Sequence, residues 1–418
     1  MMEFRNLPAA LLAAISLTFA ATSTAEAQEW TRFRGPNGSG QSEATTIPAV
    51  WNAQDELFKT KLPGTGNSSP VLWGDKVFLL SADPDNGTRY VLCLSAVDGK
   101  ILWQRDYPSQ VHPIHQLNTL ASSTPVVDEN RVYCAWSTPE AFTLLALSHD
   151  GEPVWEANLG PFISQHGFGT SPILFGDLLI ITNDQDADSF TIAVDRNSGV
   201  TKWKIDRKHL PEQNTCYATP CVYDPPGRPA ELILCSRAHG VTSLDPLTGQ
   251  TRWEEAGVFG QRPVSSPIVV DGRILATCGQ GGGNNNLVAL KPYTDGNHAK
   301  LEYQVDRTSA PYVPSLVAKG NLVFLWGDRG VVSCMNATDG TIVWRNRVGG
   351  DYFGSPVRVA DVVYCISTEG EVAAIKAAGE FELLGKSPLG DTSRATPAIA
   401  SGKMYLRSAS HLIAVGKP

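Results

Sequence analysis

Runs of lysine or arginine are missing from this chain, and its charge balance is mildly acidic, with 34 basic and 42 acidic residues and a formal net charge of -8. A protein that binds nucleic acid normally carries a basic patch or stripe, and anionic membrane surfaces attract similar basic clusters. We therefore expect neither as a partner. Long amphipathic helical patterns are also missing after the first residues, which predicts an all-β fold. The hydrophobic content of 42% is typical of a globular protein.

The first residues have the form of a targeting segment. Arg5 precedes an apolar stretch at 7–21, and Ala25-Glu26-Ala27 has the small-x-small form of a cleavage site. The apolar stretch is too short and too rich in alanine for a membrane span. We predict a signal peptide over 1–27 and an exported protein, periplasmic or extracellular, with no stable membrane span after cleavage. The alternative is an N-terminal anchor that is retained.

Export permits disulfides, and eight cysteines form an even set. Cys93 and Cys334 stand where related segments have alanine, and other cysteines stand in apolar positions of expected strands. We expect buried free thiols at such positions. Cys216 and Cys221 flank one junction between a loop and a strand, and they are the pair for which we would expect a disulfide.

A unit of about 40–55 residues recurs along the chain, a length typical of solenoids and propellers. Each unit continues as a short apolar strand, a turn with Gly or Asp, and a second strand, as in 71–80. Because hydroxyl residues open the units as a repeat feature, none stands out as a nucleophile. Eight unit starts carry a hydroxyl residue next to proline, with the order reversed in one of them: Ser69-Pro70, Thr124-Pro125, Ser171-Pro172, Thr219-Pro220, Ser266-Pro267, Pro314-Ser315, Ser355-Pro356 and Thr396-Pro397.

The second half of the units follows the frame A-x-D-x-x-T-G-x-x-x-W. The glycine supplies the positive φ of a tight turn between the third and fourth strands. The aromatic residue lies on the outer strand, where a flat ring fills the gap between neighbouring sheets. One unit has the pair Leu383-Leu384 at this position. The predicted inter-blade residues are Trp103, Trp155, Trp203, Trp253, Tyr303 and Trp344.

These units predict four-stranded antiparallel sheets that bury their faces against one another around an axis. The last unit ends after a strand at 412–415 and lacks an outer strand, whereas 57–62 is an unpaired strand before the first unit. We therefore predict a single eight-bladed β-propeller over 51–418, closed by an N-terminal strand that completes the last blade and removes an exposed edge. We expect 28–50 to form an ordered arm on the propeller.

The repeated A-x-D-x-x-T-G-x-x-x-W frame resembles the repeat of quinoprotein (pyrroloquinoline quinone, PQQ) propellers over essentially 52–418, and Trp30-Thr31-Arg32-Phe33-Arg34-Gly35-Pro36 resembles the opening of secreted bacterial PQQ-like repeat proteins. Two better-understood branches share this propeller. One comprises PQQ-dependent alcohol and sugar dehydrogenases, and the other is the non-catalytic propeller of the outer-membrane protein assembly machinery. The resemblance implies, for the dehydrogenases, an adjacent Cys pair, a stacking Trp and carboxylate and amide ligands for calcium. This chain lacks adjacent cysteines and a C-x-x-C-H haem motif, although some quinoprotein propellers also lack the pair.

The loops that lead from the outer strand of one blade to the inner strand of the next gather on one face around the channel, where ligand sites form. Here they carry polar and aromatic residues with both signs of charge. We expect them to hold a small polar or carbohydrate-like ligand or a protein loop. The candidate residues are His112, His115, Gln116, Asn118, Gln165, His166, Asn214, Tyr217, Arg262, Tyr312, Asp351, Tyr352 and Arg394.

Other patterns carry less information about function. His112, His115 and His166 come from neighbouring loops and are candidate zinc or copper ligands, but no carboxylate partner accompanies them, and we predict no metal. The segment 184–188 has the start of a calcium loop without its glycine. The segment 281–286 is no phosphate cradle because no helix follows it, and we expect a flexible connection there.

We therefore expect a monomeric, non-catalytic exported propeller that binds a protein or a small polar ligand on its channel face, without a cofactor. Two alternatives stay open. One is a periplasmic alcohol or sugar oxidoreductase that depends on PQQ and calcium. The other is a cell-envelope assembly factor, which would be expected to carry a lipid anchor, yet no cysteine lies near the predicted cleavage site.

Overall fold

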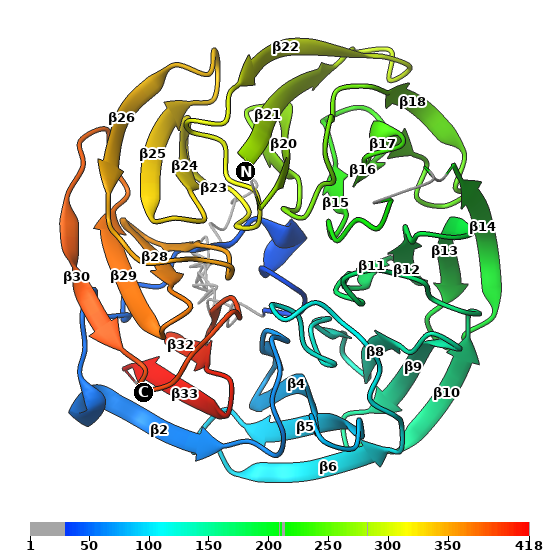
Figure 1. Cartoon of the computed structure of the whole chain (residues 1–418), viewed down its shortest axis with the longest axis vertical. Coiled ribbons are helices and arrows are strands. Elements are labelled where there is room, and N and C mark those ends of the chain that lie inside the picture. Colours follow the sequence, from blue (N-terminus) through cyan, green and yellow to red (C-terminus); the bar gives the residue numbers. More distant parts are fainter. Residues whose placement is uncertain (1–29, 209, 211–213, 282, 418) are drawn as a thin grey trace, which may run out of the picture.

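The computed structural model of this chain describes residues 30–208, 210, 214–281 and 283–417. The predicted signal peptide lies outside them. Eight antiparallel sheets surround a central channel and form a closed ring (Figure 1). The prediction of a single all-β, eight-bladed propeller is confirmed.

The strands run from the channel outward in chain order within each blade. Blades 1 to 4 consist of β3 (Val71–Trp73), β4 (Lys76–Ala82), β5 (Arg89–Ser95) and β6 (Ile101–Tyr107); β7 (Val126–Val127), β8 (Arg131–Ser137), β9 (Phe142–Ser148) and β10 (Pro153–Asn158); β11 (Ile173–Phe175), β12 (Leu178–Asn183), β13 (Ser189–Asp195) and β14 (Thr201–Arg207); and β15 (Cys221–Tyr223), β16 (Glu231–Ser236), β17 (Gly240–Leu244) and β18 (Thr251–Glu255).

Blades 5 to 8 follow the same plan, with strands at both ends of the chain in the last. They consist of β19 (Ile268–Val270), β20 (Arg273–Gln280), β21 (Gly283–Pro292) and β22 (Ala299–Val305); β23 (Val317–Lys319), β24 (Leu322–Trp326), β25 (Val331–Asn336) and β26 (Ile342–Arg347); β27 (Val357–Val359), β28 (Val362–Ile366), β29 (Glu371–Lys376) and β30 (Leu383–Pro388); and β31 (Ala398–Ala400), β32 (Lys403–Arg407), β33 (His411–Gly416) and β2 (Glu56–Lys61).

The core lies between neighbouring blades, on the second and third strands of each. Strand β12 is buried along its whole length, because both of its faces pack against other blades, whereas the outer strand β6 has no fully buried residue. Strands that are buried on both faces need continuous apolar runs rather than alternation. The apolar second and third strands of the repeat therefore form the seams of the ring.

At five of the eight seams, an aromatic side chain of one blade donates a hydrogen bond to a carbonyl group of the following blade. Trp155 on β10 donates from its indole Nε1 to the carbonyl of Arg196, at 2.9 Å. Gly199, in the β13–β14 turn, has a φ of +71°, and a Cβ there would lie 2.7 Å from the Trp155 ring. The glycine thus serves the turn and also leaves room for the ring. Trp103, Trp203, Tyr303 and Trp344 likewise donate to carbonyls of the next blade.

Trp253 differs from the other predicted inter-blade residues. Its indole Nε1 donates to the carboxylate of Glu231, which lies in the same blade, at 2.8 Å. Glu231 is buried and also accepts a hydrogen bond from Ser243.

The ring closes as predicted. Strand β2 pairs antiparallel with β33, with Phe58 opposite Ala414 and Lys61 opposite His411. Phe58 lies against Gly99 of blade 1, where a Cβ would come within 2.4 Å of its ring. It therefore takes the place that tryptophan has at other seams. Figure 1 shows this strand, in blue, beside the red C-terminal strands.

The opening hydroxyl residues surround the channel and are joined by seven hydrogen bonds, a set that we call the hydroxyl belt. The backbone N–H of one opening residue donates to the side-chain Oγ of the next, at 3.0 Å, and Thr396 joins the last blade to the first by donating to Ser69. Among the described residues, no such bond runs from Ser171 to Thr219. Ser315 takes part although proline precedes it instead of following it. The repeat therefore keeps the hydroxyl group in register rather than the proline. The remaining bonds start from Ser69, Thr124, Thr219, Ser266, Ser315 and Ser355.

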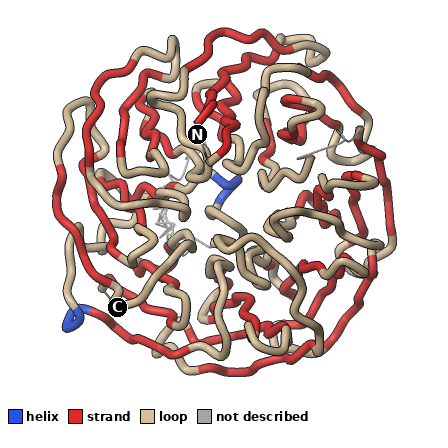
Figure 2. Tube along the Cα trace, in the orientation of Figure 1, coloured by secondary structure: helices blue, strands red, loops and turns tan. Residues whose placement is uncertain are grey.

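The segment 30–42, which we call the arm, crosses the channel below the belt. It contains a short 3-10 helix, η1 (Pro36–Gly38), and strand β1 (Gln41–Ser42), which pairs parallel with β27 and gives blade 7 a fifth strand. This fifth strand differs from the prediction of four-stranded blades. Figures 1 and 2 show η1 in the centre of the ring.

The arm binds the innermost strands on several sides of the channel. The carbonyl of Trp30 accepts from the N–H of Leu72 in blade 1, and the side chain of Asn37 exchanges two hydrogen bonds with the backbone of Val222 in blade 4. The Arg34 side chain is fully buried, and its guanidinium donates to carbonyl groups, including that of Pro356, at 3.1 Å. The arm therefore ties together blades that are far apart in the sequence.

Helices have little part in the fold (Figure 2). The two assigned to the described residues are η1 and the 3-10 helix η2 (Ala53–Asp55). In the part of the chain that the structure describes, no helix has the length and apolar character needed to cross a membrane.

All eight cysteines are buried free thiols. The predicted Cys216–Cys221 disulfide is wrong. Cys221 begins β15 and packs in the core between blades 4 and 5, whereas Cys216 lies in the preceding loop, where its thiol donates to the carbonyl of Asn214. Burial raises the pKa of Cys221 to about 12.

Candidate functional site

A cavity of about 630 Å³ occupies the channel. Along the chain, the loop residues come before each belt residue, and the innermost strand follows it. The arm binds the innermost strand three residues after the belt residue, as at Val127, which follows Thr124. The loops and the arm therefore lie at opposite ends of the belt. Phe33 of the arm and most of the belt residues line the cavity. Because the arm crosses the channel, the cavity is a cup that opens on the loop side.

Eight of the predicted site residues line this cavity. They come from loops before seven different blades and include aromatic, amide and charged groups: His115, Asn118, His166, Tyr217, Arg262, Tyr312, Asp351 and Arg394.

Five predicted residues lie elsewhere. Tyr352 is fully buried and packs against Trp326, with ring centroids 5.3 Å apart. Asn214 is buried and donates to the carbonyl of Gln185, so it supports the loop. The other three are His112, Gln116 and Gln165, of which His112 lines a smaller pocket and the two glutamines are exposed.

The cavity wall is organised around the side chain of Arg262. Its Nε donates to the hydroxyl of Tyr312 at 3.1 Å, and its two terminal nitrogens lie 3.1 and 3.2 Å from the ring nitrogens of His166. The imidazole of His166 stacks on that of His115, with centroids 4.7 Å apart. Asn118 anchors this loop by donating to the carbonyl of His166 at 2.7 Å.

His166 is uncharged at neutral pH. Burial, the guanidinium of Arg262 and the neighbouring His115 lower its pKa to about 4. A neutral imidazole carries hydrogen on one nitrogen and accepts at the other. Therefore only one of the two short nitrogen–nitrogen distances between Arg262 and His166 is a hydrogen bond, in which Arg262 donates.

The acidic groups of the cavity are engaged by the protein. The carboxylate of Asp328 accepts from the backbone N–H groups of Tyr312 and Val313, at 2.8 and 3.0 Å. Burial raises the pKa of Asp328, and these hydrogen bonds oppose that effect. Asp351 pairs with Arg329 at 3.2 Å on the exposed rim.

Sequence reasoning missed Asp328, Arg329 and Asn285, which also line the cavity. Asp328 and Arg329 lie in the turn between the second and third strands of blade 6. In an antiparallel blade, this turn lies at the same end as the loop that leads to the next blade. The repeat pattern contains this signal. Asn285 was missed because the expectation of a flexible connection at 281–286 was wrong: β21 begins at Gly283.

The segment 184–188 has a structural role. Asp184 forms a buried ion pair with Arg207, at 2.8 Å, and Asp186 accepts from the backbone N–H groups of Asn214 and Thr215. Its carboxylates therefore hold the loops of blade 3 together instead of facing one common point.

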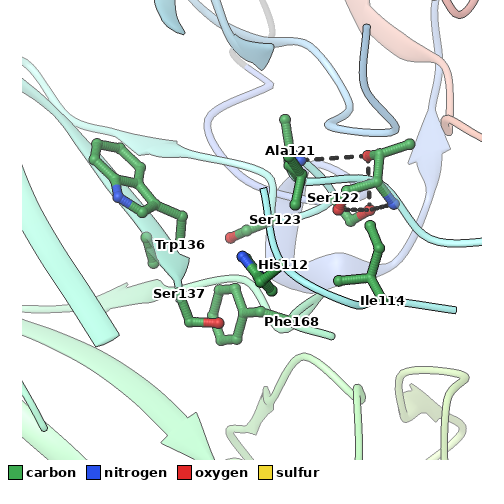
Figure 3. Close-up of a pocket in the computed structure, with 11 residues that line it drawn as sticks. His112, Ile114, Ala121, Ser122, Ser123, Trp136, Ser137 and Phe168 are labelled. Atoms are coloured by element: carbon green, nitrogen blue, oxygen red, sulfur yellow. Dashed lines mark hydrogen bonds between the residues drawn. The ribbon is translucent and has the colours of Figure 1, made fainter. Parts of the chain in front are cut away.

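A second pocket, shown in Figure 3, is lined by His112, Trp136 and Phe168. Its volume is about 10 Å³, which is space for one water molecule. The hydroxyl groups of Ser123 and Ser137 line it, and both lack a hydrogen-bond partner among the described residues. The pocket is therefore too small for an organic ligand.

Neither a metal centre nor a quinone site matches these residues. Within the described ranges, no three His, Cys, Asp or Glu residues are grouped to hold a metal ion, and His112 lies apart from the stacked pair of His115 and His166. The resemblance to quinoprotein dehydrogenases implies a stacking Trp and a Cys pair. No Trp or Cys belongs to the described lining of the cavity, and its half-buried carboxylate, Asp328, is occupied by backbone donors. The lining does not fit PQQ with calcium.

A family model described as outer membrane protein assembly factor BamB matches residues 43–181, 89–310 and 307–415. No curated protein matches the chain in sequence.

Solved structures share the fold. BamB from Moraxella catarrhalis has a TM-score of 0.61 at 15% identity, over 86% of this chain and 98% of that chain. Quinohemoprotein alcohol dehydrogenase from Comamonas testosteroni has a TM-score of 0.66 at 14% identity, over 93% and 80%. The computationally designed Ika8 protein has a TM-score of 0.60 at 12% identity, over 86% and 99%. One fold thus carries an assembly factor, an enzyme and a design, and function must be argued from the site.

Proposed function

This chain belongs to the family described as outer membrane protein assembly factor BamB, and from this premise we propose that it is an exported, non-catalytic PQQ-like β-propeller that binds a small polar ligand in the cup of its channel. The observation that carries the proposal is the cup itself. Its volume of about 630 Å³ lies within the range of small-molecule sites. The arm ends the cavity at Phe33, which favours a compact ligand over a segment that threads the ring.

The chemistry of the lining favours binding over catalysis. Belt residues such as Ser171 and Thr124 use their oxygens to accept backbone N–H groups of the preceding blade. A nucleophilic hydroxyl needs a neighbouring general base, and His166 is instead directed at Arg262. Rings, amides and guanidinium groups remain, and these are groups that orient a ligand.

The proposal is tested by measuring thermal stabilisation with sugars, sugar acids and amino acids. A ligand that binds the folded state raises its stability by RT ln(1 + [L]/Kd). We expect at least one compound to stabilise the protein, and Leu117→Trp, which fills the cavity, to remove the effect. Leu247→Trp is the control, because Leu247 is exposed and does not line the cavity. If no compound stabilises the protein, or if Leu117→Trp keeps the effect, the proposal fails.

An assembly role is the second candidate, and the description of the family favours it. In that case, deletion of the gene lowers the amounts of folded outer membrane proteins, and the Leu117→Trp variant restores them, because a partner surface does not need the cavity.

A PQQ enzyme is distinguished by adding PQQ and calcium to the purified protein. A retained quinone absorbance band with dye-linked alcohol or sugar oxidation would replace our proposal.

Export belongs to the same proposal. It rests on the targeting pattern of the first residues and predicts a mature protein that begins after Ala27. Measurement of the intact mass of the protein from its native host tests this.

A further inference from the structure

Unpaired positive charge is the distinctive property of the cup. Arg262 and Arg394 both line it, and no described carboxylate forms an ion pair with either. The Nε of Arg394 is buried and has no hydrogen-bond partner among the described residues. A buried N–H group without a partner is costly. A negatively charged group of a ligand would remove that cost.

The acidic groups of the cup do not supply this partner. Asp328 is held by two backbone N–H groups, and Asp351 is paired with Arg329 on the rim. The available charge facing the cavity is therefore positive, although the whole chain is acidic, with a net charge of -8. A positively charged cavity in a protein of negative net charge favours the binding of an anion in that cavity.

Arg262 is prepared to hold a carboxylate. Of the five N–H groups of a guanidinium, the Nε–H is taken by the hydroxyl of Tyr312, and one N–H on each terminal nitrogen faces His166. One N–H remains on each terminal nitrogen, and these two N–H groups point to opposite sides of the guanidinium because the pair between the terminal nitrogens faces His166. Each of them can donate one charge-assisted hydrogen bond to an oxygen of a ligand. The neutral His166 leaves the positive charge of the guanidinium uncompensated.

The rest of the lining fits hydroxyl groups. Seven of the eight belt hydroxyls accept from the backbone and keep their own hydrogen, as at Ser69 and Ser355, where no acceptor for it is found among the described residues. The Oδ1 of Asn285 is buried and has no described partner. The rings of Tyr217 and Phe353 provide flat apolar surface. Donors, an acceptor and rings together match the alternating polar and apolar faces of a sugar.

We infer that the cup binds an acidic carbohydrate, a sugar that carries a carboxylate, with the carboxylate beside the guanidinium of Arg262. Arg394 lies in the loop before blade 8, whereas Arg262 precedes blade 5. Arg394 therefore forms a second anion anchor on another side of the channel. This inference rests on the proposed small-molecule function and specifies its ligand.

The test is isothermal titration of the full mature protein with three probes: glucuronate, glucose and sulfate. Charged hydrogen bonds contribute enough for an affinity difference of about 10–100-fold. We expect glucuronate to bind at least about 10-fold more tightly than glucose and more tightly than sulfate, with affinity that falls as salt rises.

Variants of one residue type give the matched comparison. Arg262→Met removes the positive charge, and we expect it to weaken glucuronate by about 10–100-fold while it changes glucose by less than about threefold. Arg345→Met is the control, because Arg345 is exposed on the outer strand β26 and does not line the cavity. Arg262→Lys keeps the charge and should retain more of the preference for glucuronate than Arg262→Met does. It is also the second variant if Arg262→Met does not fold.

The outcomes separate this inference from the proposed function. If glucose and glucuronate bind equally and Leu117→Trp blocks both, the cup binds small molecules but the acidic-carbohydrate assignment is overturned. Equal affinity for sulfate and glucuronate would overturn it as well, because the cup would then select any anion. If Arg345→Met is as harmful as Arg262→Met, Arg262 is not the anchor.

Discussion

Replacing Gly199 with alanine places a methyl group against the Trp155 indole, at the seam between blades 2 and 3. Gly176, in the β11–β12 turn of blade 3, provides a matched control. Both glycines have positive φ, +71° at Gly199 and +54° at Gly176. A Cβ at Gly199 would lie 2.7 and 2.8 Å from two ring carbons of Trp155, whereas a Cβ at Gly176 would meet no atom within 4 Å. Comparing the alanine substitutions at Gly199 and Gly176 therefore separates the cost of backbone strain from the cost of crowding at the seam.

The magnitude follows from these distances. An L-residue in the left-handed region costs about 1–2 kcal/mol, and both substitutions carry this cost. At Gly199, the ring must also move by about 0.8 Å to reach ordinary carbon contact near 3.5 Å. Crowding of this kind costs about 1–3 kcal/mol. We therefore expect Gly199→Ala to lower the free energy of unfolding by about 1–3 kcal/mol more than Gly176→Ala does.

The assay is urea denaturation, which compares midpoints at an unchanged slope. A double-mutant cycle with Trp155→Leu completes it, because a smaller side chain leaves room for the new methyl group. In the Trp155→Leu background, Gly199→Ala should cost only the backbone term, which gives a coupling of about 1–3 kcal/mol. Equal effects of the two alanine substitutions in the wild type, or a coupling near zero, would refute the role of the glycine at the seam.

Four other predictions concern closure, the belt, pH and the thiols. Deletion of 51–62 exposes the edge of β33, so we expect aggregation or failure to fold, seen by size-exclusion chromatography; undiminished thermal stability would contradict the closure. Ser315→Ala removes the acceptor of the buried Ser266 N–H and should cost about 1–3 kcal/mol, with Ser315→Thr as a milder control in urea titrations. The folded pKa of His166, about 4, lies below its ordinary value near 6.5, so between these values the unfolded chain binds the extra proton and stability falls as pH falls; His166→Gln should weaken this dependence of the urea midpoint. Thiol titration should find no reactive cysteine in the folded protein and eight after denaturation, and fewer than eight would indicate a disulfide.

The scaffold was largely predictable because each blade repeats its own local signals. The interval from Gly199 to Trp203 recurs in several blades, and the missing outer strand of the last blade predicted the pairing of β2 with β33. The path of the arm was not predictable in the same way. Arg34 binds the carbonyl of Pro356, 322 positions away, and a single contact at such a distance leaves no period in the sequence.

The cavity residues were predictable only as a group. Sequence position identifies the loops that meet at the channel, but the direction of each side chain depends on packing. Tyr312 faces the cavity, whereas Tyr352, in an equivalent loop, is buried against Trp326. The interaction of Arg262 with His166 joins loops of two blades that are not adjacent in the ring, which no spacing indicates.

Closure by β2 also sets the order of events during synthesis. The strand ends at Lys61, and its partner begins at His411, 350 residues later. At about 5–20 residues per second, roughly 20–70 s pass before that partner exists. During this interval an edge strand waits unpaired, and charged residues on such an edge discourage pairing with other chains. Lys59 and Lys61 stand in β2, so the strand that finishes the ring also carries its own protection against premature association.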